Sequence, residues 1–404
     1  MHFKTDIIKH SNKIILFFLL SFFISSCSES YNLQTDTYEE AIVIEATLTN
    51  ELKKQEIKIT KTSRFEDTDV AVETGANVVV KDNLNNEYLF TEKSGVYVSE
   101  SEFEVVANRQ YTLEVKTKDG KVYRSSSETL PTVTPITDVT ASVVVNSKNE
   151  TGVQLNANSY DPNRTSNYYR YEYEETYKLV APKWTNDRAT VTGPKSIRID
   201  DDNDPAKKIC YSTQKSTDII VTSTNNLTED RVNFPVRFIK ENDYKIAQRY
   251  SILVRQYVEN KAAYTFHKTM KEISSSSSVL SPKQPGVFSG NIRCISNVDE
   301  KVMGYFDIAT VSSKRIFFNY TDFFPPTNNP AYINACEPMK LNFCFALNST
   351  PACDGYTVIS GLQGGGLLYY AGDADEGSTI IMVETPCGDC TSFSSNIIPS
   401  FWKE

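Results

Sequence analysis

The cysteines are the residues of this chain with the widest choice of chemistry. Eight are present, and those that follow Cys27 are Cys210, Cys294, Cys336, Cys344, Cys353, Cys387 and Cys390. Five of these seven lie within residues 336–390, and Cys387 and Cys390 have CxxC spacing. A thioredoxin-like redox site needs that motif at the start of a helix in a βαβ unit, and the surrounding sequence shows neither.

Two interpretations of this cluster remain open. In the first, Cys387 and Cys390 bind zinc together with two of the three upstream cysteines of the cluster. In the second, disulfides hold together a loop-rich region, and an oxidising exported setting favours this alternative. We expect disulfides that join Cys387 and Cys390 to upstream members of the cluster, with Cys210 and Cys294 either paired to each other or free. Because seven is odd, at least one thiol stays unpaired.

Histidine, a common general base and metal ligand, is scarce in this chain. There are three, and His2 and His10 lie in the N-terminal leader described below, which leaves His267 in the mature chain. Catalytic triads and most zinc sites use His, so a two-histidine metal site is excluded within the mature chain. We expect a protein that is not an enzyme and that has no catalytic residues and no cofactor. His267 falls on a predicted helix, and we interpret it as a surface or partly packed residue.

Asp200, Asp202 and Asp204 alternate along the chain, which is the spacing of carboxylate ligands in calcium loops. An EF-hand loop needs a Gly after the third ligand, and Pro205 stands at that position. We therefore predict a solvated acidic loop, with a calcium site as the alternative.

Aromatic residues alternate with charged residues in residues 168–177. On a strand, Tyr169, Tyr171 and Tyr173 fall on one face and the charged residues between them on the other. Together with Trp184, these rings could form an aromatic platform for sugars or peptides. The same alternation is the commonest sign of a half-buried strand with packed Tyr rings, and we favour this interpretation.

The N-terminal segment has the features of a secretory leader. Lys4, Lys9 and Lys13 accompany an apolar run of 11 residues at positions 14–24, which is interrupted only by Ser21. A membrane span takes about 20 apolar residues, so the run fits the core of a signal peptide instead. Removal of residues 1–26 leaves 378 residues with a formal net charge of -11, which argues against binding to nucleic acid.

The residues around Cys27 resemble a bacterial lipobox, with an aliphatic residue, two small residues and the obligatory Cys in the order ISSC. We predict cleavage after Ser26 and a diacylglycerol lipid on the Cys27 thiol. Ser28 and Glu29 follow, and an acidic residue at this place resembles the surface-export signal of Bacteroidota lipoproteins. We therefore expect a lipid-anchored outer-membrane protein exposed at the cell surface.

Short alternating runs bounded by turn residues indicate β-strands through most of the mature chain. The clearest lie at 111–124, where two alternating segments flank Asp119 and Gly120, whose types tolerate the positive φ of a tight hairpin. The one convincing helix spans 260–273, and Asn260 can cap its first turn. Residues 321–376 are expected to be rich in loops.

The pattern predicts a mainly β fold. An N-terminal β-sandwich, immunoglobulin-like or carboxypeptidase-regulatory-like, is followed by a larger β-rich region with the one helix. The expected parts are the signal peptide at 1–26, the lipidated Cys and tether at 27–37, the sandwich at 38–132, and a C-terminal region at 133–404 that can divide into 133–290 and 291–404.

Segments spread over nearly the whole mature chain carry a resemblance to a known family. They are IVIEATLTN, GANVVVKD, GVYVSE, YTLEVKTKDGKVYRSS, the CYST at Cys210, YSILVRQY, SGNI, EKVMGYFDIATVSSKRIFF, and the terminal CGDC and PSFW. Their order resembles the Bacteroidota outer-membrane lipoprotein family called domain of unknown function 4249. The resemblance implies an outer-membrane lipoprotein encoded beside a TonB-dependent outer-membrane transporter, and it carries over no catalytic residues.

These observations together predict a non-enzymatic accessory of a TonB-dependent nutrient transporter that helps to capture the transported substrate. Anchoring beside the pore raises the effective concentration of a ligand, so even a weak binder would help uptake. The alternative is a surface adhesin or carbohydrate-binding lipoprotein without a transporter, in which the exposed aromatic rings would stack on the ligand. A hydrolase is the least expected class, because the mature chain has one His.

Overall fold

The computed structural model describes residues 40–62, 71–275, 290–346 and 349–404. All of them except Glu40 belong to one compact unit. The predicted leader and the lipidation and export residues Ser26, Cys27, Ser28 and Glu29 lie outside the described residues. Strands make up 48% of the structure and helices 12%, which confirms the predicted mainly β class. In the described part, no helix is both long enough and apolar enough to cross a membrane.

Eight strands begin the N-terminal module. They are β1 (Ile42–Thr49), β2 (Glu56–Lys61), β3 (Asn77–Asp82), β4 (Glu87–Lys93), β5 (Val96–Ser99), β6 (Gln110–Lys116), β7 (Val122–Ser125) and β8 (Glu128–Thr129). Alternation places Ile42, Ile44 and Leu48 of β1 in a buried core. The hairpin between β6 and β7 turns at Gly120, whose φ is 88°, as the Asp119-Gly120 pair predicts.

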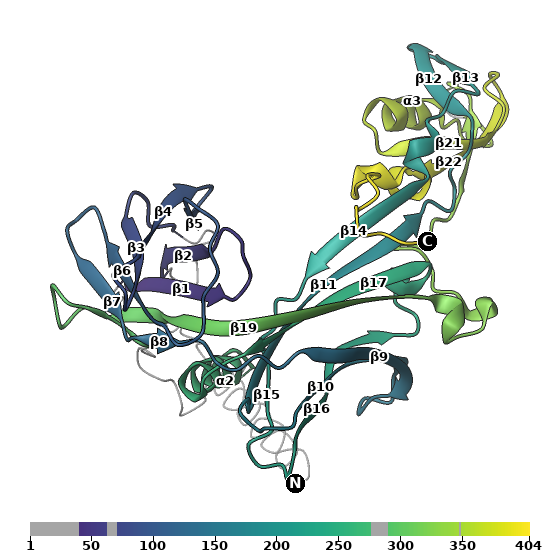
Figure 1. The fold of residues 1–404 in the computed structure, drawn as a ribbon. Helices are drawn as coiled ribbons and strands as arrows, with labels where there is room; N and C mark the ends of the chain where they lie inside the picture. Colours follow the sequence, from purple (N-terminus) through teal and green to yellow (C-terminus); the bar gives the residue numbers. More distant parts are fainter. Residues whose placement is uncertain (1–39, 63–70, 276–289, 347–348) are drawn as a thin grey trace, which may run out of the picture. The chain divides into compact units, whose positions relative to one another are not determined.

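Two strands from much later in the chain complete this module. β18 (Ile292–Cys294) pairs with β7, and β19 (Val302–Asn319) runs parallel to β1. The second half of β19 pairs with β17 (Arg249–Val258), so one long strand joins both parts of a large sheet (Figure 1). A boundary after residue 132 therefore does not separate two self-contained domains, and residues 291–404 do not form a unit of their own.

The pairing of β1 with β19 depends on a glycine. Gly304 has a φ of 98°, a conformation that L side chains rarely adopt. A Cβ atom at this position would lie 2.0 Å from the carbonyl oxygen of Ile44. Only glycine permits this close approach of the two backbones.

The large sheet continues beyond β17, and a smaller sheet packs against it. β11 (Tyr168–Val180), β14 (Ile209–Lys215) and β15 (Ile220–Ser223) extend the large sheet, whereas β9 (Ile136–Val145), β10 (Thr151–Asp161) and β16 (Asp230–Lys240) form the small one. Val153 and Leu155 of β10 share a buried core with Ile252 and Val254 of β17. Apolar faces of the two sheets thus make the second core.

The C-terminal part contains more regular structure than the sequence predicts. A hairpin of β12 (Arg188–Gly193) and β13 (Ser196–Asp200) is joined by β20 (Met339–Phe343), α3 (Gly355–Gln363), β21 (Leu367–Gly372), β22 (Ser378–Glu384) and α4 (Thr385–Gly388). Ile197 of the hairpin packs with Phe343 and Val358 in one apolar cluster. The expectation of a loop-rich segment at 321–376 is therefore wrong for β20, α3 and β21. These elements are short, and their core is completed by Ile197 from the distant β12–β13 hairpin.

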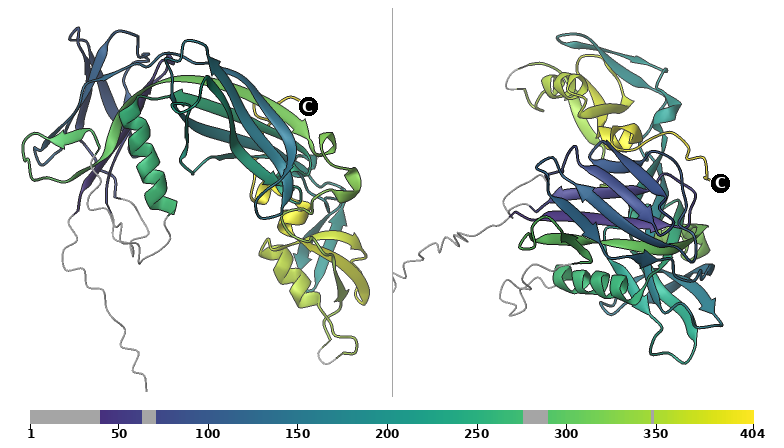
Figure 2. Two further views of the ribbon diagram at one scale, coloured as in Figure 1. Left: turned by 90° about the horizontal axis from the view of Figure 1, so that it is seen from below. Right: turned by 60° about the vertical axis from the view of Figure 1, so that its left-hand side comes forward.

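Helix α2 (Lys261–Ser275) agrees with the predicted helix at 260–273. Asn260 Oδ1 accepts a hydrogen bond from the backbone N–H of Ala263 at 2.8 Å, as expected of a cap. The ring of Phe266 lies 5.0 Å from the ring of Tyr305 on β19. Helix α2 therefore packs against the face of β19 that points away from the N-terminal core (Figure 2).

Candidate functional site

A cavity of about 330 Å³ lies between β1, β11, β19 and α2. Even-numbered residues of β1 and β19 fill the N-terminal core, so the odd-numbered residues face the other way. Strand β1 contributes Glu45 and Thr47 to the wall, β11 contributes Arg170 and Glu172, and the loop before β15 contributes Asp218. Helix α2 contributes Phe266, His267 and Met270, and β19 contributes Met303, Tyr305 and Asp307. Strand pairing places Thr47 opposite Asp307.

An ion-pair network borders this cavity. Arg170 Nε donates a hydrogen bond to Glu259 Oε1 at 2.5 Å, and His267 Nδ1 lies 3.0 Å from the same oxygen. The Glu259 side chain is fully buried, whereas Arg170 is 10% and His267 18% exposed. The network ties β11 to the end of β17 and to the second turn of α2. His267 is thus a partly buried ion-pair partner.

The outer side of Arg170 is also held in place. Its guanidinium pairs with Glu172, and its central carbon lies 4.2 Å from the centre of the Tyr257 ring. The Tyr257 hydroxyl donates to Glu172 Oε2 at 2.9 Å, and Arg255 Nε donates to that hydroxyl at 3.2 Å. Arg170 therefore has its contacts within the protein and presents a rigid charged wall.

Asp307 is the exception to this pairing. It is 1% exposed, it faces the cavity, and neither of its carboxyl oxygens makes a hydrogen bond. Buried polar groups in proteins are nearly always paired, so an unpaired buried acid requires an explanation. Arg170, which lines the same cavity, is already engaged by Glu259 and Glu172.

The two buried carboxyl groups differ in protonation. Burial raises the pKa of Asp307 well above its usual range, and the negative charge of Glu259 adds to this effect. Burial also raises the pKa of Glu259, but the hydrogen bond with His267 and the charge of Arg170 outweigh it, so that pKa lies below its usual range. The two neighbouring pKa values are therefore shifted in opposite directions, and Asp307 takes up a proton far more readily than Glu259. Carboxyl groups with such separated pKa values are common in functional sites.

Replacing Asp307 by asparagine should stabilise the protein at neutral pH and change little near pH 4. Below about pH 4, an aspartate also holds its proton in the unfolded chain. Above that pH, the unfolded chain releases the proton while the raised pKa keeps it on native Asp307. This difference costs the wild type about 1.4 kcal/mol per pH unit. Unfolding curves of D307N and wild type between about pH 4 and pH 8 measure the gap, and a constant gap would contradict the prediction.

The tyrosine row of β11 lies mostly away from this site. Tyr169 and Tyr171 are 0% and 1% exposed and belong to the core between the two sheets. The aromatic-platform interpretation is therefore wrong for them, and the packed-strand interpretation is correct. Tyr173 is partly buried against the same core, and of the three only Tyr171 borders the cavity. The charged face of the strand, through Arg170, is the face that builds the site.

Trp184 and the three aspartates have structural partners. The Trp184 indole N–H donates to the backbone oxygen of Asp204 at 3.1 Å, and Trp184 does not line the cavity. Asp200 pairs with an arginine at 2.8 Å and Asp202 with another at 2.6 Å, while the Asp204 side chain caps the short helix that follows it. In the part of the chain that the structure describes, no three His, Cys, Asp or Glu residues gather as metal ligands. The calcium alternative therefore has no support.

The cysteines form three disulfides, Cys210–Cys390, Cys336–Cys387 and Cys344–Cys353. The zinc interpretation is wrong, because every thiol of the cluster is paired. Cys294 is a buried free thiol, so it is not a disulfide partner.

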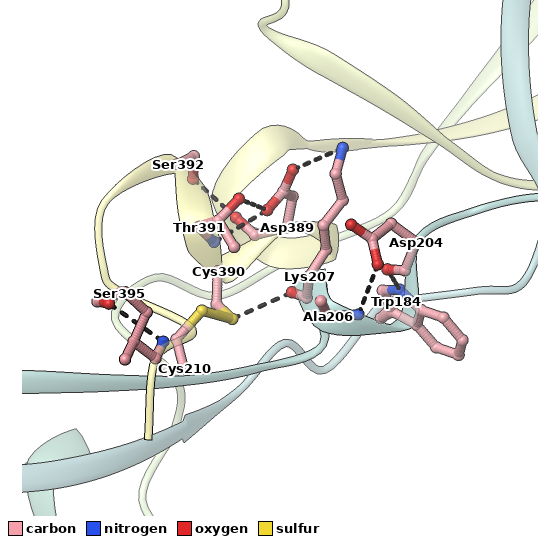
Figure 3. Close-up of a disulfide and its surroundings, with 11 residues drawn as sticks. Trp184, Asp204, Ala206, Lys207, Cys210, Asp389, Cys390, Thr391, Ser392 and Ser395 are labelled. Atoms are coloured by element: carbon pink, nitrogen blue, oxygen red, sulfur yellow. Dashed lines mark hydrogen bonds and ion pairs between the residues drawn. A yellow bond between two sulfur atoms is a disulfide. The ribbon is translucent and has the colours of Figure 1, made fainter. Parts of the chain in front are cut away.

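The pairing of Cys390 differs from the expected one. Cys387 joins an upstream member of the cluster as expected, but Cys390 joins Cys210, which lies 180 residues earlier. The C-terminal segment returns to β14, where Tyr211 N–H donates to the Ser395 backbone oxygen at 2.7 Å. Figure 3 shows this disulfide, with Cys390 Sγ also 3.0 Å from the backbone oxygen of Lys207. It fastens the C-terminal segment to β14 of the large sheet.

One feature of the sequence indicates the cavity although it belongs to no recognised motif. Asp307 is the single charged residue in the run from Val302 to Val311, which otherwise reads as a buried strand. A charged residue inside such a run is rarely buried without a reason. Arg170 and Glu259 could not be joined by this kind of argument, because 89 residues separate them.

Comparison with known proteins bears on the family alone. No curated protein matches the sequence. A match to the family described as Domain of unknown function (DUF4249) covers residues 28–315, which is most of the chain and includes every wall residue named above. The chain therefore belongs to the DUF4249 family.

Proposed function

We propose that this chain is a lipid-anchored outer-membrane protein, exposed at the cell surface, that captures a small ligand for a TonB-dependent transporter. A lipid on Cys27 would hold the mature chain at the membrane, and Ser28 and Glu29 would direct it to the outer face. The cavity between β1, β11, β19 and α2 would receive the ligand. The protein would act by binding and delivery, without catalysis.

The observation that carries the capture function is the unpaired carboxyl group of Asp307 in the cavity wall. Leaving a buried polar group without a partner costs about 1–3 kcal/mol. A ligand that hydrogen-bonds to Asp307 would remove this cost. The neighbouring Arg170 and Glu259 are paired and buried, so they would not have to rearrange when the ligand enters.

The lipid anchor supports delivery to a pore. Binding beside a transporter makes the second encounter effectively intramolecular, which can raise the overall efficiency of capture without any new contact. The lipobox-like ISSC at residues 24–27 and the acidic Glu29 are the features that support this placement. An adhesin that uses the β11 tyrosines receives less support, because Tyr169 and Tyr171 are buried.

Purification from the native outer membrane tests this function. The full chain carries a C-terminal tag and is extracted in mild detergent, and we expect a TonB-dependent transporter to co-purify in near-stoichiometric amount. The matched control is Cys27→Ala, which should lose both the membrane association and the transporter. Recovery of the lipidated wild type as a monomer without a transporter would contradict the proposal.

A further inference from the structure

We propose that the cavity binds an organic cation, an ammonium or guanidinium group on a short apolar body, with Asp307 as its counter-charge. This inference names the ligand class of the capture function proposed above and rests on that function for its biological setting. The binding itself is a property of the cavity and can be measured on the chain alone.

The charges around the cavity favour a cation. The lining carboxyl groups are Glu45, Glu172, Asp218 and Asp307, and the lining basic residues are Arg170 and His267. Both basic residues are bound to Glu259, which adds a fifth carboxyl group behind the wall. Lys58 lies 3.9 Å from Glu45, but both of these side chains are more than half exposed. An anion entering the cavity would meet no free positive charge among the lining residues.

Asp307 gives the cation a defined position. Its carboxyl group borders the cavity and both oxygens are buried without a hydrogen-bond partner, so a donor on the ligand that reaches them would satisfy a group that the protein leaves unpaired. A hydrogen bond between an ammonium or guanidinium and a carboxylate is about twice as strong as a neutral one. A metal ion is a poorer occupant, because in the described residues no three ligating side chains converge there.

The remaining walls suit an apolar body next to the charge. Phe266 and Tyr305 pack with ring centres 5.0 Å apart, and Met270 and Met303 line the same cavity. Aromatic faces attract cations directly, and Met side chains adapt to irregular apolar shapes. A ligand with an amine at one end and a small apolar group at the other therefore matches both parts of the wall.

Binding should release a proton. Without ligand, burial raises the pKa of Asp307 well above its usual range and so favours the protonated carboxyl group. When the cation arrives, the Asp307 O–H bond breaks, the proton passes to solvent, and the carboxylate pairs with the cation, which keeps its own proton. Charged and titratable groups near Asp307 are Glu45 on β1, Glu128 on β8, Arg170 and Glu172 on β11, Glu259 after β17 and His267 on α2.

Calorimetric titration of the detergent-purified full chain tests this proposal. The probes are 2-phenylethylamine, its neutral counterpart 2-phenylethanol and the anion 3-phenylpropionate. A second arm uses phenylalanylalanine with a free or an acetylated amino group, because the end of a peptide offers the same cation as a free amine. Asp307→Asn removes the counter-charge. Asp138→Asn, an exposed residue on β9 that pairs with Lys314, is the matched control.

We expect the amine to bind at least tenfold more tightly than the alcohol or the acid, and D307N to lose at least tenfold in affinity for it. D138N should stay within about twofold of wild type. Titrations in buffers of different ionisation enthalpy should show about one proton released per amine at neutral pH. His267→Gln should keep this release and D307N should lose it. Preference for the free over the acetylated dipeptide would identify a peptide end as a source.

Three outcomes would overturn the proposal: no binding of either amine, equal binding of the amine and the alcohol, or undiminished binding to D307N. The unfolding temperature of D307N, expected to equal or exceed that of wild type, separates loss of the site from loss of the fold. These titrations need no transporter. Failure of these titrations would not contradict the proposed transporter association. Failed co-purification would not contradict the proposed ligand class.

Discussion

Removing the Cys210–Cys390 disulfide should destabilise the protein more than removing either of the other two. A disulfide stabilises mainly by limiting the unfolded chain, and the effect grows with the length of the closed loop. The loops of Cys210–Cys390, Cys336–Cys387 and Cys344–Cys353 span 180, 51 and 9 residues. The corresponding losses on paired substitution by alanine are about 5, 4 and 3 kcal/mol. Denaturant unfolding of the three double variants measures this order.

The three pairs act as controls for one another. Cys210 and Cys390 are both fully buried, so part of their loss is the small cavity that alanine leaves. The single variant Cys294→Ala, at the buried free thiol, measures that packing contribution without any change in loop closure. If the Cys344–Cys353 variant lost as much stability as the Cys210–Cys390 variant, the loop-length account would be wrong.

Replacing Arg170 by leucine should cost about 3–5 kcal/mol of folding free energy. The substitution leaves Glu259 fully buried and ionised. Of its two ion-pair partners, Arg170 and His267, it then keeps His267. The low pKa of Glu259 depends partly on Arg170, so this pKa should be higher in the variant. The loss should therefore grow as the pH rises from the pKa of Glu259 in the wild type to its pKa in the variant, and stay constant above that range. Thermal unfolding across that pH range measures the effect.

Two further variants make this prediction specific. Arg170→Leu combined with Glu259→Leu should be more stable than Arg170→Leu alone, because no unpaired buried charge remains. Arg188→Leu removes an ion pair with Asp202 whose two side chains are about half exposed, and it should cost less than about 1 kcal/mol. A double variant that is no more stable than the single one would show that Arg170 acts by packing rather than by charge.

The strands and the helix were predictable wherever the signal is local. Apolar alternation identifies β1 and the β6–β7 hairpin, and the Asn260 cap with helical spacing identifies α2. Along the long strand β19, the sequence changes from apolar to polar near Ser313, so the local pattern does not predict one continuous strand. The strand is continuous because its two halves pair with different partners, β1 and β17. Such long-range pairing leaves no mark in the local pattern.

The candidate site was less predictable than the fold. The alternation in β11 correctly separates Tyr169 and Tyr171 from Arg170 and Glu172, but it does not say which face is buried against a core. The charged face borders the cavity, with Arg170 held by a glutamate 89 residues away. The Cys210–Cys390 disulfide was equally hard to predict, because spacing alone allows many pairings of seven cysteines.

The protonation of Asp307 tests the central claim most directly, because the cavity is a capture site in this account only if that acid is buried and unpaired. Infrared difference spectra of the full chain, wild type minus D307N, detect the carbonyl band of a protonated carboxyl group. The account predicts this band at neutral pH, in line with the raised pKa of Asp307, and its disappearance when 2-phenylethylamine binds. A spectrum showing only an ionised carboxylate at neutral pH before any ligand is added would contradict it.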